Sequence, residues 1–255
     1  MRKQPVIKFL LSAIIMFGVL LCVPCRDTAS AQQKQTLILN SSFRTTLTSP
    51  DKTGFLDLIY KELAKRMGIE IIIQYLPSER AIKNADRGIE DGDICRIFAI
   101  NARGEYPNLV RVPEKIMQFQ MMIFTNKSDV VVNEPKDLQP YDVGIVTGWK
   151  IVERNTTLAY SVVSVEKGEQ LFAMLGKKRI DIAIIERMIG MKLMKDSGVK
   201  NVRMLSTPFL SGYWYPYLNK KHEALIPKFA EAIKAIKEDG TYERIQSEVL
   251  ARYAL

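Results

Sequence analysis

The feature that most constrains the fold is an alternation of short apolar runs with amphipathic runs, which begins at Thr36 and restarts after Pro140. The run that starts at Thr36 (TLILN) predicts a strand. Phe55–Met67 carries apolar residues at helical spacing and stops at Gly68, so it predicts a helix with a glycine end. Glu70–Tyr75 is rich in β-branched residues and predicts the next strand.

The same alternation continues through the rest of the chain. The further elements that we expect are a helix over Pro77–Arg87, a strand over Asp93–Phe98, a strand over Asp142–Val146, a helix start at Trp149–Asn155, a strand over Ser161–Val165, a helix over Glu169–Leu175, a strand over Ile180–Ile185, and closing helices at about Ala224–Lys237 and Tyr242–Tyr253. A repeated strand-helix-strand order favours parallel sheets with helices packed on their faces. The sequence therefore predicts an α/β protein with two halves of similar size.

The N-terminus has the pattern of an export signal. Arg2 and Lys3 precede an apolar run over Phe9–Val23, and a short polar stretch ends in Ala29-Ser30-Ala31. A membrane-spanning helix needs about 20 apolar residues, and this run stops at Pro24. We expect residues 1–31 to be a cleaved signal peptide and the remainder to be a periplasmic protein.

Composition argues against several classes of function. The chain carries a formal net charge of +9, but its basic residues are scattered over helical segments without interleaved aromatics, which argues against nucleic acid as a partner. Of three cysteines only Cys95 follows the expected cleavage site, and the chain has a single histidine, His222. No cluster of metal ligands or acid–base groups emerges, so we expect no metal, no cofactor and no enzymatic activity.

Four phrases along the chain carry a resemblance to a known family. They are Gly54-Phe55-Leu56-Asp57-Leu58, Gly88-Ile89-Glu90-Asp91, Lys178-Arg179-Ile180-Asp181-Ile182-Ala183, and the closing segment Leu225–Ile245 with its Asp239-Gly240-Thr241-Tyr242. In these phrases the chain resembles the type II periplasmic solute-binding proteins of solute-binding protein family 3. That branch includes the polar amino-acid binders of ABC importers. The resemblance covers nearly all of the chain that follows residue 31.

Three further phrases make the chain similar to a less characterised subgroup of this family. They are Leu76-Pro77-Ser78-Glu79-Arg80, Asp91-Gly92-Asp93 with Arg96, and Tyr106–Glu114. Members of this subgroup often have no known ligand. The last phrase stands where amino-acid binders have a different pattern, so the resemblance leaves the identity of the ligand open.

The resemblance implies a two-lobed periplasmic-binding-protein type II fold. Each lobe should be a mainly parallel sheet flanked by helices, and the ligand should lie in the cleft between the lobes. Lobe one is expected to comprise residues 32–124 and 213–255, and lobe two residues 125–212. The cluster Tyr213-Trp214-Tyr215 then falls at the return crossover, where hinge packing and ligand stacking are both open roles.

Three arginines are candidates to bind a carboxylate on the ligand, since a planar guanidinium matches a carboxylate with two hydrogen bonds. Arg103 lies at an offset after Asp91 that matches the arginine of amino-acid binders. Arg96 lies at the carboxyl end of a strand, at a position where the family has a small residue, and Arg80 lies at the start of a helix that borders the cleft in the subgroup. The alternatives are an ion pair within the protein for Arg96 and Arg103, and a solvated helix residue for Arg80.

Lobe two offers two further candidates by resemblance. Thr147, Gly148 and Trp149 follow a strand and open a helix, where the family presents backbone N–H groups and a hydroxyl to an anion. Glu186 matches the position of an acidic residue that pairs with the ammonium group of the ligand in amino-acid binders. The alternative for Glu186 is a surface charge at the end of a strand.

The function implied by the resemblance is solute capture. A monomer would bind a small polar, carboxylate-bearing and amino-acid-like solute, close its lobes, and deliver the solute to the membrane permease of an ABC importer. Two alternatives remain open. The chain could be the ligand-binding partner of a membrane sensor, or a periplasmic dehydratase-like enzyme built on the same fold.

Overall fold

This computed structural model describes residues 35–100 and 104–252. The expected signal peptide over residues 1–31 lies outside the described residues and stays a prediction. Within the described ranges, no helix combines the length and the apolar character needed to cross a membrane. The described residues cluster as one unit.

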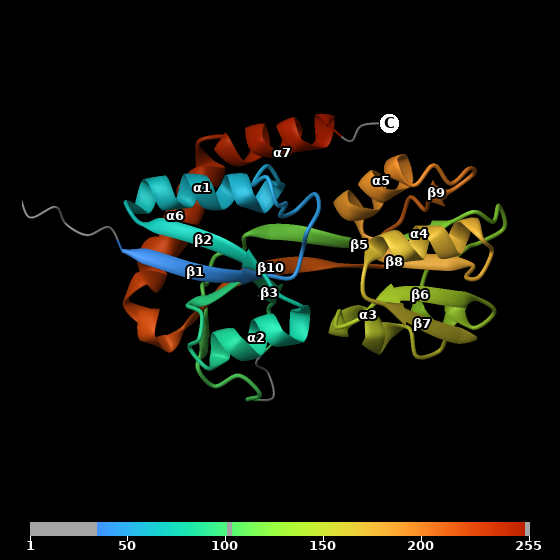
Figure 1. The fold of residues 1–255 in the computed structure, drawn as a ribbon, viewed down its shortest axis with the longest axis horizontal. Coiled ribbons are helices and arrows are strands. Elements are labelled where there is room, and N and C mark those ends of the chain that lie inside the picture. Colours follow the sequence, from blue (N-terminus) through green and yellow to red (C-terminus); the bar gives the residue numbers. More distant parts are fainter. Residues whose placement is uncertain (1–34, 101–103, 253–255) are drawn as a thin grey trace, which may run out of the picture. The chain divides into compact units, whose positions relative to one another are not determined.

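Two groups of parallel strands form the framework (Figure 1). In the N-terminal strand group, β1 (Thr36–Ser41) lies between β2 (Glu70–Tyr75) and β3 (Gly92–Ile97) and is parallel to both. In the central strand group, β6 (Asp142–Val146) lies between β7 (Ser161–Val165) and β8 (Ile182–Glu186), again in parallel. Both parallel arrangements agree with the strand-helix-strand alternation of the sequence.

Two antiparallel strands join the groups into one sheet. β5 (Met117–Thr125) pairs with β8 at one end and with β10 (Leu210–Asn219) at the other, and β10 continues alongside β3. The resulting strand order is β2-β1-β3-β10-β5-β8-β6-β7, with β4 (Leu109–Arg111) on β10 and β9 (Arg203–Met204) on β5. The sequence pattern did not predict β5 or β10. The predicted lobe boundaries fall inside these two strands and stay predictions.

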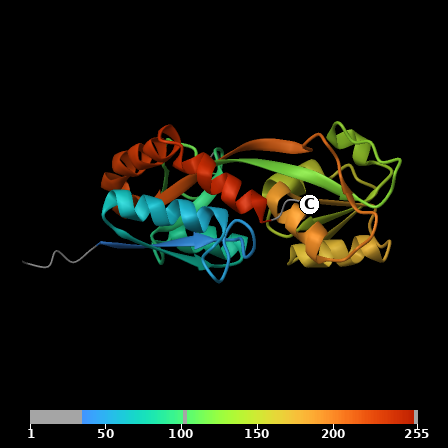
Figure 2. The ribbon, with the colours of Figure 1, turned by 90° about the horizontal axis from the view of Figure 1, so that it is seen from above.

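Helices cover both faces of the sheet. The remaining elements are α1 (Phe55–Met67), α2 (Ser78–Asp86), η1 (Pro135–Leu138), α3 (Lys150–Asn155), α4 (Gly168–Gly176), α5 (Arg187–Asp196), η2 (Lys220–Leu225), α6 (Ile226–Glu238) and α7 (Thr241–Ala251). Helix α1 packs on α6 and α7, and α2 lies on the opposite face of the N-terminal strand group (Figures 1 and 2). Helices α4 and α5 pack on each other and on β8. The bounds of α1, β2, β6 and β7 are those predicted from sequence.

The start of α1 shows how a short phrase specifies a helix boundary. The Oδ2 atom of Asp57 accepts hydrogen bonds from the backbone N–H groups of Gly54 (3.1 Å) and Ser49 (2.7 Å). The bond from Gly54 satisfies a donor at the N-terminus of the helix, and the bond from Ser49 ties the preceding loop to it. A Cβ at Gly54 would lie 2.6 Å from the carbonyl oxygen of Leu47, so this position accepts only glycine. The apolar face of α1 then packs into the core through Phe55 and Leu63, which are fully buried.

A close approach of two strands leads to the first prediction. A Cβ at Gly92 would lie 2.2 Å from the backbone carbonyl oxygen of Tyr217 in β10. We expect Gly92→Ala to push β3 from β10 and to lower the free energy of unfolding by about 1–3 kcal/mol, the usual cost of overpacking. Urea unfolding monitored by circular dichroism measures this change. Ser164→Ala, on an exposed position of β7, is the control and should stay within about 0.5 kcal/mol of wild type; equal stability of the two variants would contradict the prediction.

Candidate functional site

A cavity of about 250 Å³ lies where the carboxyl ends of strands from both groups meet. The N-terminal strand group contributes the segment after β1, the start of α2 and the end of β3, whereas the central strand group contributes the segment after β6 and the start of α3. Strands β5 and β10 add Met121 and Trp214. We call this space the central cavity. Ligands of open α/β sheets bind at such strand ends.

An ion pair at the end of β3 is the main charged feature of the central cavity wall. Nη2 of Arg96 lies 2.6 Å from Oδ2 of Asp93, and their side chains are only 11% and 1% exposed. Burial raises the pKa of the Asp93 carboxyl, and the adjacent guanidinium opposes that shift. The Nε–H of Arg96 is buried without a hydrogen-bond partner among the described residues. Arg96 lines the cavity, and its second Nη1–H also has no partner among the described residues.

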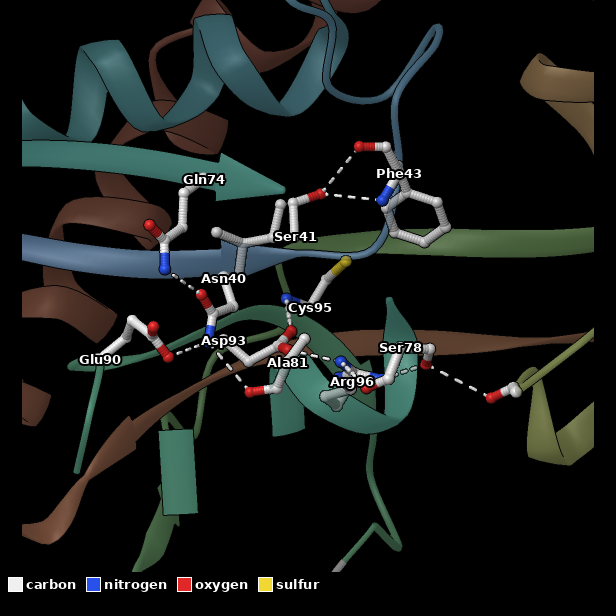
Figure 3. Close-up of polar contacts among 12 residues, drawn as sticks. Asn40, Ser41, Phe43, Gln74, Ser78, Ala81, Glu90, Asp93, Cys95 and Arg96 are labelled. Carbon is white, nitrogen blue, oxygen red and sulfur yellow. Dashed lines mark hydrogen bonds and ion pairs between the residues drawn. The ribbon is translucent and has the colours of Figure 1, made fainter. Parts of the chain in front are cut away.

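The same guanidinium organises the start of α2. Nη1 of Arg96 donates to Oγ of Ser78 (2.8 Å), and Nη2 donates to the Ser78 carbonyl oxygen (3.1 Å). The Ser78 hydroxyl in turn donates to the carbonyl oxygen of Gly148 in the central strand group (3.3 Å) (Figure 3). A chain of polar contacts therefore runs from the buried Asp93 through Arg96 and Ser78 to Gly148, across the edge of the central cavity. A Cβ on Gly148 would come within 3.2 Å of the Ser78 Cβ, so a glycine permits this approach.

A second contact joins the same two elements. Nζ of Lys150 lies 3.5 Å from Oε1 of Glu79, and both side chains are nearly half exposed. Lys150 also pairs with Glu153 at 3.0 Å. We call the contacts of Ser78 with Gly148 and of Glu79 with Lys150 the clasp.

An amide network holds α2 in position for these contacts. Asn40, at the end of β1 and fully buried, donates through Nδ2 to the carbonyl oxygen of Ala81 (3.0 Å) and to Oε2 of Glu90 (2.9 Å). Gln74 of β2 donates to Oδ1 of Asn40 (3.0 Å). Figure 3 shows these bonds beside the Arg96 pair. Because Asn40 ties the second turn of α2 to β1, the first turn is held at the central cavity.

Aromatic rings form another part of the wall. The ring of Phe43, just after β1, meets Trp149 edge-on at 5.9 Å and Trp214 at 5.2 Å between centroids. Trp214 also stacks on Phe119 of β5 at 5.1 Å. Phe43 and Trp149 border a second cavity of about 260 Å³ as well, so this pair separates the two spaces.

The side chain of Cys95 also lines the central cavity. Burial raises the pKa of its thiol well above the usual value, so the thiol stays protonated at neutral pH. A protonated, buried thiol is a poor nucleophile. The described residues contain no group of three or more histidine, cysteine or acidic side chains that could hold a metal ion.

Glu186 occupies the junction of β8 and α5. Its Oε2 accepts hydrogen bonds from the N–H groups of Met188 (2.8 Å) and Ile189 (3.1 Å), so it caps α5. Burial, which leaves the side chain 2% exposed, raises the pKa of this carboxyl to about 7 against the pull of those donors. Glu186 is not among the residues that line the central cavity. Its pairing with an ammonium group on the ligand stays an untested prediction.

The other predicted site residues divide into three sets. Arg96, Gly148 and Trp149 line the central cavity. Arg80 is exposed and borders a shallow groove on the outer side of α2, and Thr147 is exposed and outside the central cavity lining. Arg103 lies outside the described residues.

The turn after β6 uses its own backbone donors. The N–H of Thr147 donates to the Val165 carbonyl oxygen (2.8 Å), and the N–H of Gly148 donates to Oε1 of Glu153 (2.7 Å). The N–H of Trp149 points to the Val146 carbonyl oxygen (3.4 Å). An anion bound at this turn would have to replace such partners.

Sequence reasoning did not assign several residues that shape the central cavity. Ser78 and Asp93 stood inside phrases that mark the subgroup, but their contacts depend on a helix and a strand that are distant in sequence. Phe43 lies three residues after the predicted strand Thr36–Asn40, which is the one local signal that pointed to it. Trp214 was left between hinge packing and ligand stacking, and it lines the central cavity as a 5% exposed side chain.

Several known proteins are similar to this chain in sequence or in fold. An uncharacterised protein of Shewanella oneidensis is 24% identical over 210 residues, which cover 77% of this chain and 76% of that protein. An ancestral arginine-binding protein bound to arginine superposes with a TM-score of 0.70 at 17% identity, over 84% of this chain and 98% of its own. A histidine kinase sensor domain with similarity to periplasmic binding proteins gives 0.70 at 14% identity, over 86% and 96%.

These likenesses confirm the predicted α/β periplasmic-binding-protein fold. Residues 45–251 match the sequence model of a protein family, and that range includes every strand of both strand groups except β1. The chain belongs to the bacterial extracellular solute-binding proteins, family 3.

Proposed function

We propose that this chain captures a small carboxylate-bearing solute in the central cavity and delivers it, in the periplasm, to the permease of an ABC-type importer. The observation that carries the proposal is Arg96, a buried guanidinium in the central cavity wall whose second Nη1–H has no partner among the described residues. A ligand carboxylate would supply the missing acceptor through a charge-assisted hydrogen bond. Family membership supports a binding role, and the proposal includes no catalysis.

Closure would proceed through the clasp. Ser78 and Glu79 face Gly148 and Lys150 across the edge of the central cavity. A ligand held by Arg96 on one side and by Trp149 on the other favours the same approach of the two strand groups. Closing the cavity then excludes water and strengthens each polar contact inside it.

A second role is supported by one comparison. The TM-score against a histidine kinase sensor domain equals the TM-score against the arginine-binding protein, 0.70. The same binding event could therefore report to a membrane sensor. Loss of solute uptake in cells that lack the chain would support delivery to a permease. Normal uptake with a lost transcriptional response would support the sensor role.

A thermal-shift screen tests the proposed ligand class. Purified chain is mixed with amino acids, organic acids, polyamines and neutral sugars. We expect carboxylates alone to raise the melting temperature, because a ligand at a hundredfold excess over its Kd adds about 2.7 kcal/mol to the free energy of unfolding. Stabilisation by polyamines or sugars without stabilisation by any carboxylate would refute the proposal.

The ion pair at Arg96 gives a prediction that separates stability from binding. Arg96→Gln leaves the Asp93 carboxyl buried without its partner and should lower the free energy of unfolding by about 3–5 kcal/mol. Asp93→Asn combined with Arg96→Gln removes both charges and should recover most of that loss, measured by urea unfolding. Both variants should bind the carboxylate identified in the screen at least about tenfold more weakly, because the charged donor is gone. Wild-type affinity in the double variant, measured by calorimetry, would show that Arg96 has only a structural role.

The clasp gives a prediction on closure. Glu79→Lys places like charges opposite each other at Lys150 and should open the ligand-free protein, with an increased radius of gyration in small-angle X-ray scattering. Adding Lys150→Glu should restore the wild-type value. The effect should be modest, since exposed pairs contribute about 0.2–1 kcal/mol, and it should fade in high salt. Glu231→Lys, an equal charge change on an exposed position of α6, is the control; the same expansion there would attribute the effect to net charge.

A further inference from the structure

The central cavity offers cations to a ligand and few anions. Arg96 lines one side, and Lys150 and Arg154 line the side formed by α3. Among the lining residues that the structure describes, the carboxylates are Glu79 and Glu105. Glu79 is nearly half exposed and lies 3.5 Å from Lys150, and Glu105 is exposed to solvent. Residues 101–103, next to the cavity in sequence, are Asn, Ala and Arg and carry no carboxylate.

Glu186, which the family resemblance assigns to an ammonium group of the ligand, caps a helix in this structure. Glu186 is outside the central cavity lining, is 2% exposed, and uses Oε2 to cap α5. To reach a ligand in the central cavity, this side chain would have to leave its buried position at the start of α5. An ammonium group taken into the cavity would then lose its water without gaining a buried anion, which is costly.

Beside the hydroxyl groups of Ser42, Ser78 and Tyr106, the rest of the wall includes apolar and aromatic side chains. The ring of Phe43 contacts the rings of Trp149 and Trp214. Ile82, Ile97 and Ile100 come from α2, from β3 and from the segment after β3. Flat aromatic surfaces bind planar apolar groups by stacking and edge contacts. The wall therefore complements a ring beside the positive end of the cavity.

We infer that the ligand is an aryl carboxylate without an ammonium group. The carboxylate would accept from Arg96, and the ring would lie against Phe43, Trp149 and Trp214. This inference rests on the proposed carboxylate-binding function and makes it narrower. It separates the chain from the amino-acid-binding proteins that share its fold, because it assigns no partner to an α-ammonium group.

A matched pair of ligands tests the inference. 3-Phenylpropanoate and L-phenylalanine have the same carbon skeleton and differ in the α-ammonium group. We expect calorimetry on the wild-type chain to show at least about tenfold tighter binding of 3-phenylpropanoate, because it brings no unpaired cation into the cavity. Phenethylamine, which has the ring and the ammonium group without the carboxylate, should not bind.

The outcomes distinguish the inference from the proposed function. Equal or tighter binding of L-phenylalanine would overturn the inference and leave the carboxylate-binding function standing. Binding of phenethylamine without binding of either carboxylate would overturn both. Binding of neither aryl carboxylate, with other carboxylates active in the thermal-shift screen, would overturn the aryl assignment alone.

Glu186→Gln provides an independent check. If Glu186 is only a helix cap, the ratio of the affinities for 3-phenylpropanoate and L-phenylalanine should not change, whatever the variant does to stability. If Glu186 holds an ammonium group, the variant should lose affinity for L-phenylalanine and spare 3-phenylpropanoate. That second result would overturn the inference.

Discussion

The buried ion pair of Asp93 with Arg96 is the constraint on which the site depends. A charge removed from water is tolerated when it is paired and hydrogen-bonded, and here Arg96 also donates to the hydroxyl and to the carbonyl oxygen of Ser78. The pair therefore fixes the start of α2 relative to β3. Since Ser78 contacts Gly148, the pair also influences how closely the central strand group approaches. Under the proposed function, ligand recognition and closure would share one guanidinium.

Much of the fold could be predicted because its signals are local. Helix α1 has its starting cap in Gly54 and Asp57 and its end in Gly68, whose φ of 68° suits glycine. Strand β2 is a β-branched run between that glycine and Pro77. Strands β5 and β10 could not be predicted in this way. Their pairing joins segments about 90 residues apart, such as Met121 with Leu210, and Pro216 interrupts the β10 pattern.

The sequence predicted where residues of the candidate site lie in the fold better than it predicted what their side chains contact. Arg96 could be placed at a strand end, and Gly148 and Trp149 at a turn between a strand and a helix, because those assignments need only the order of elements. What each group contacts depends on side chains from other elements. The partners of Arg96 are on β3 and α2, and the N–H of Gly148 is taken by Glu153, five residues along the chain. The capping role of Glu186 could have been seen, since a glutamate that directly precedes a helix is placed to accept from its first N–H groups.

The register shift in β10 between Tyr215 and Tyr217 has a mechanical consequence. β10 pairs with β5 up to Trp214 and with β4 from Tyr217, β3 pairs with it on both sides of the shift, and Pro216 adds no N–H to the ladder. Bulges bend and twist a strand locally. With β5 and β10 as a shared ribbon, a torque on one strand group is transmitted to the other as torsion of two hydrogen-bonded strands. The stiffness of that ribbon then sets the resistance to torsion between the two strand groups. Replacing Pro216 by a residue with more backbone freedom would lower that resistance.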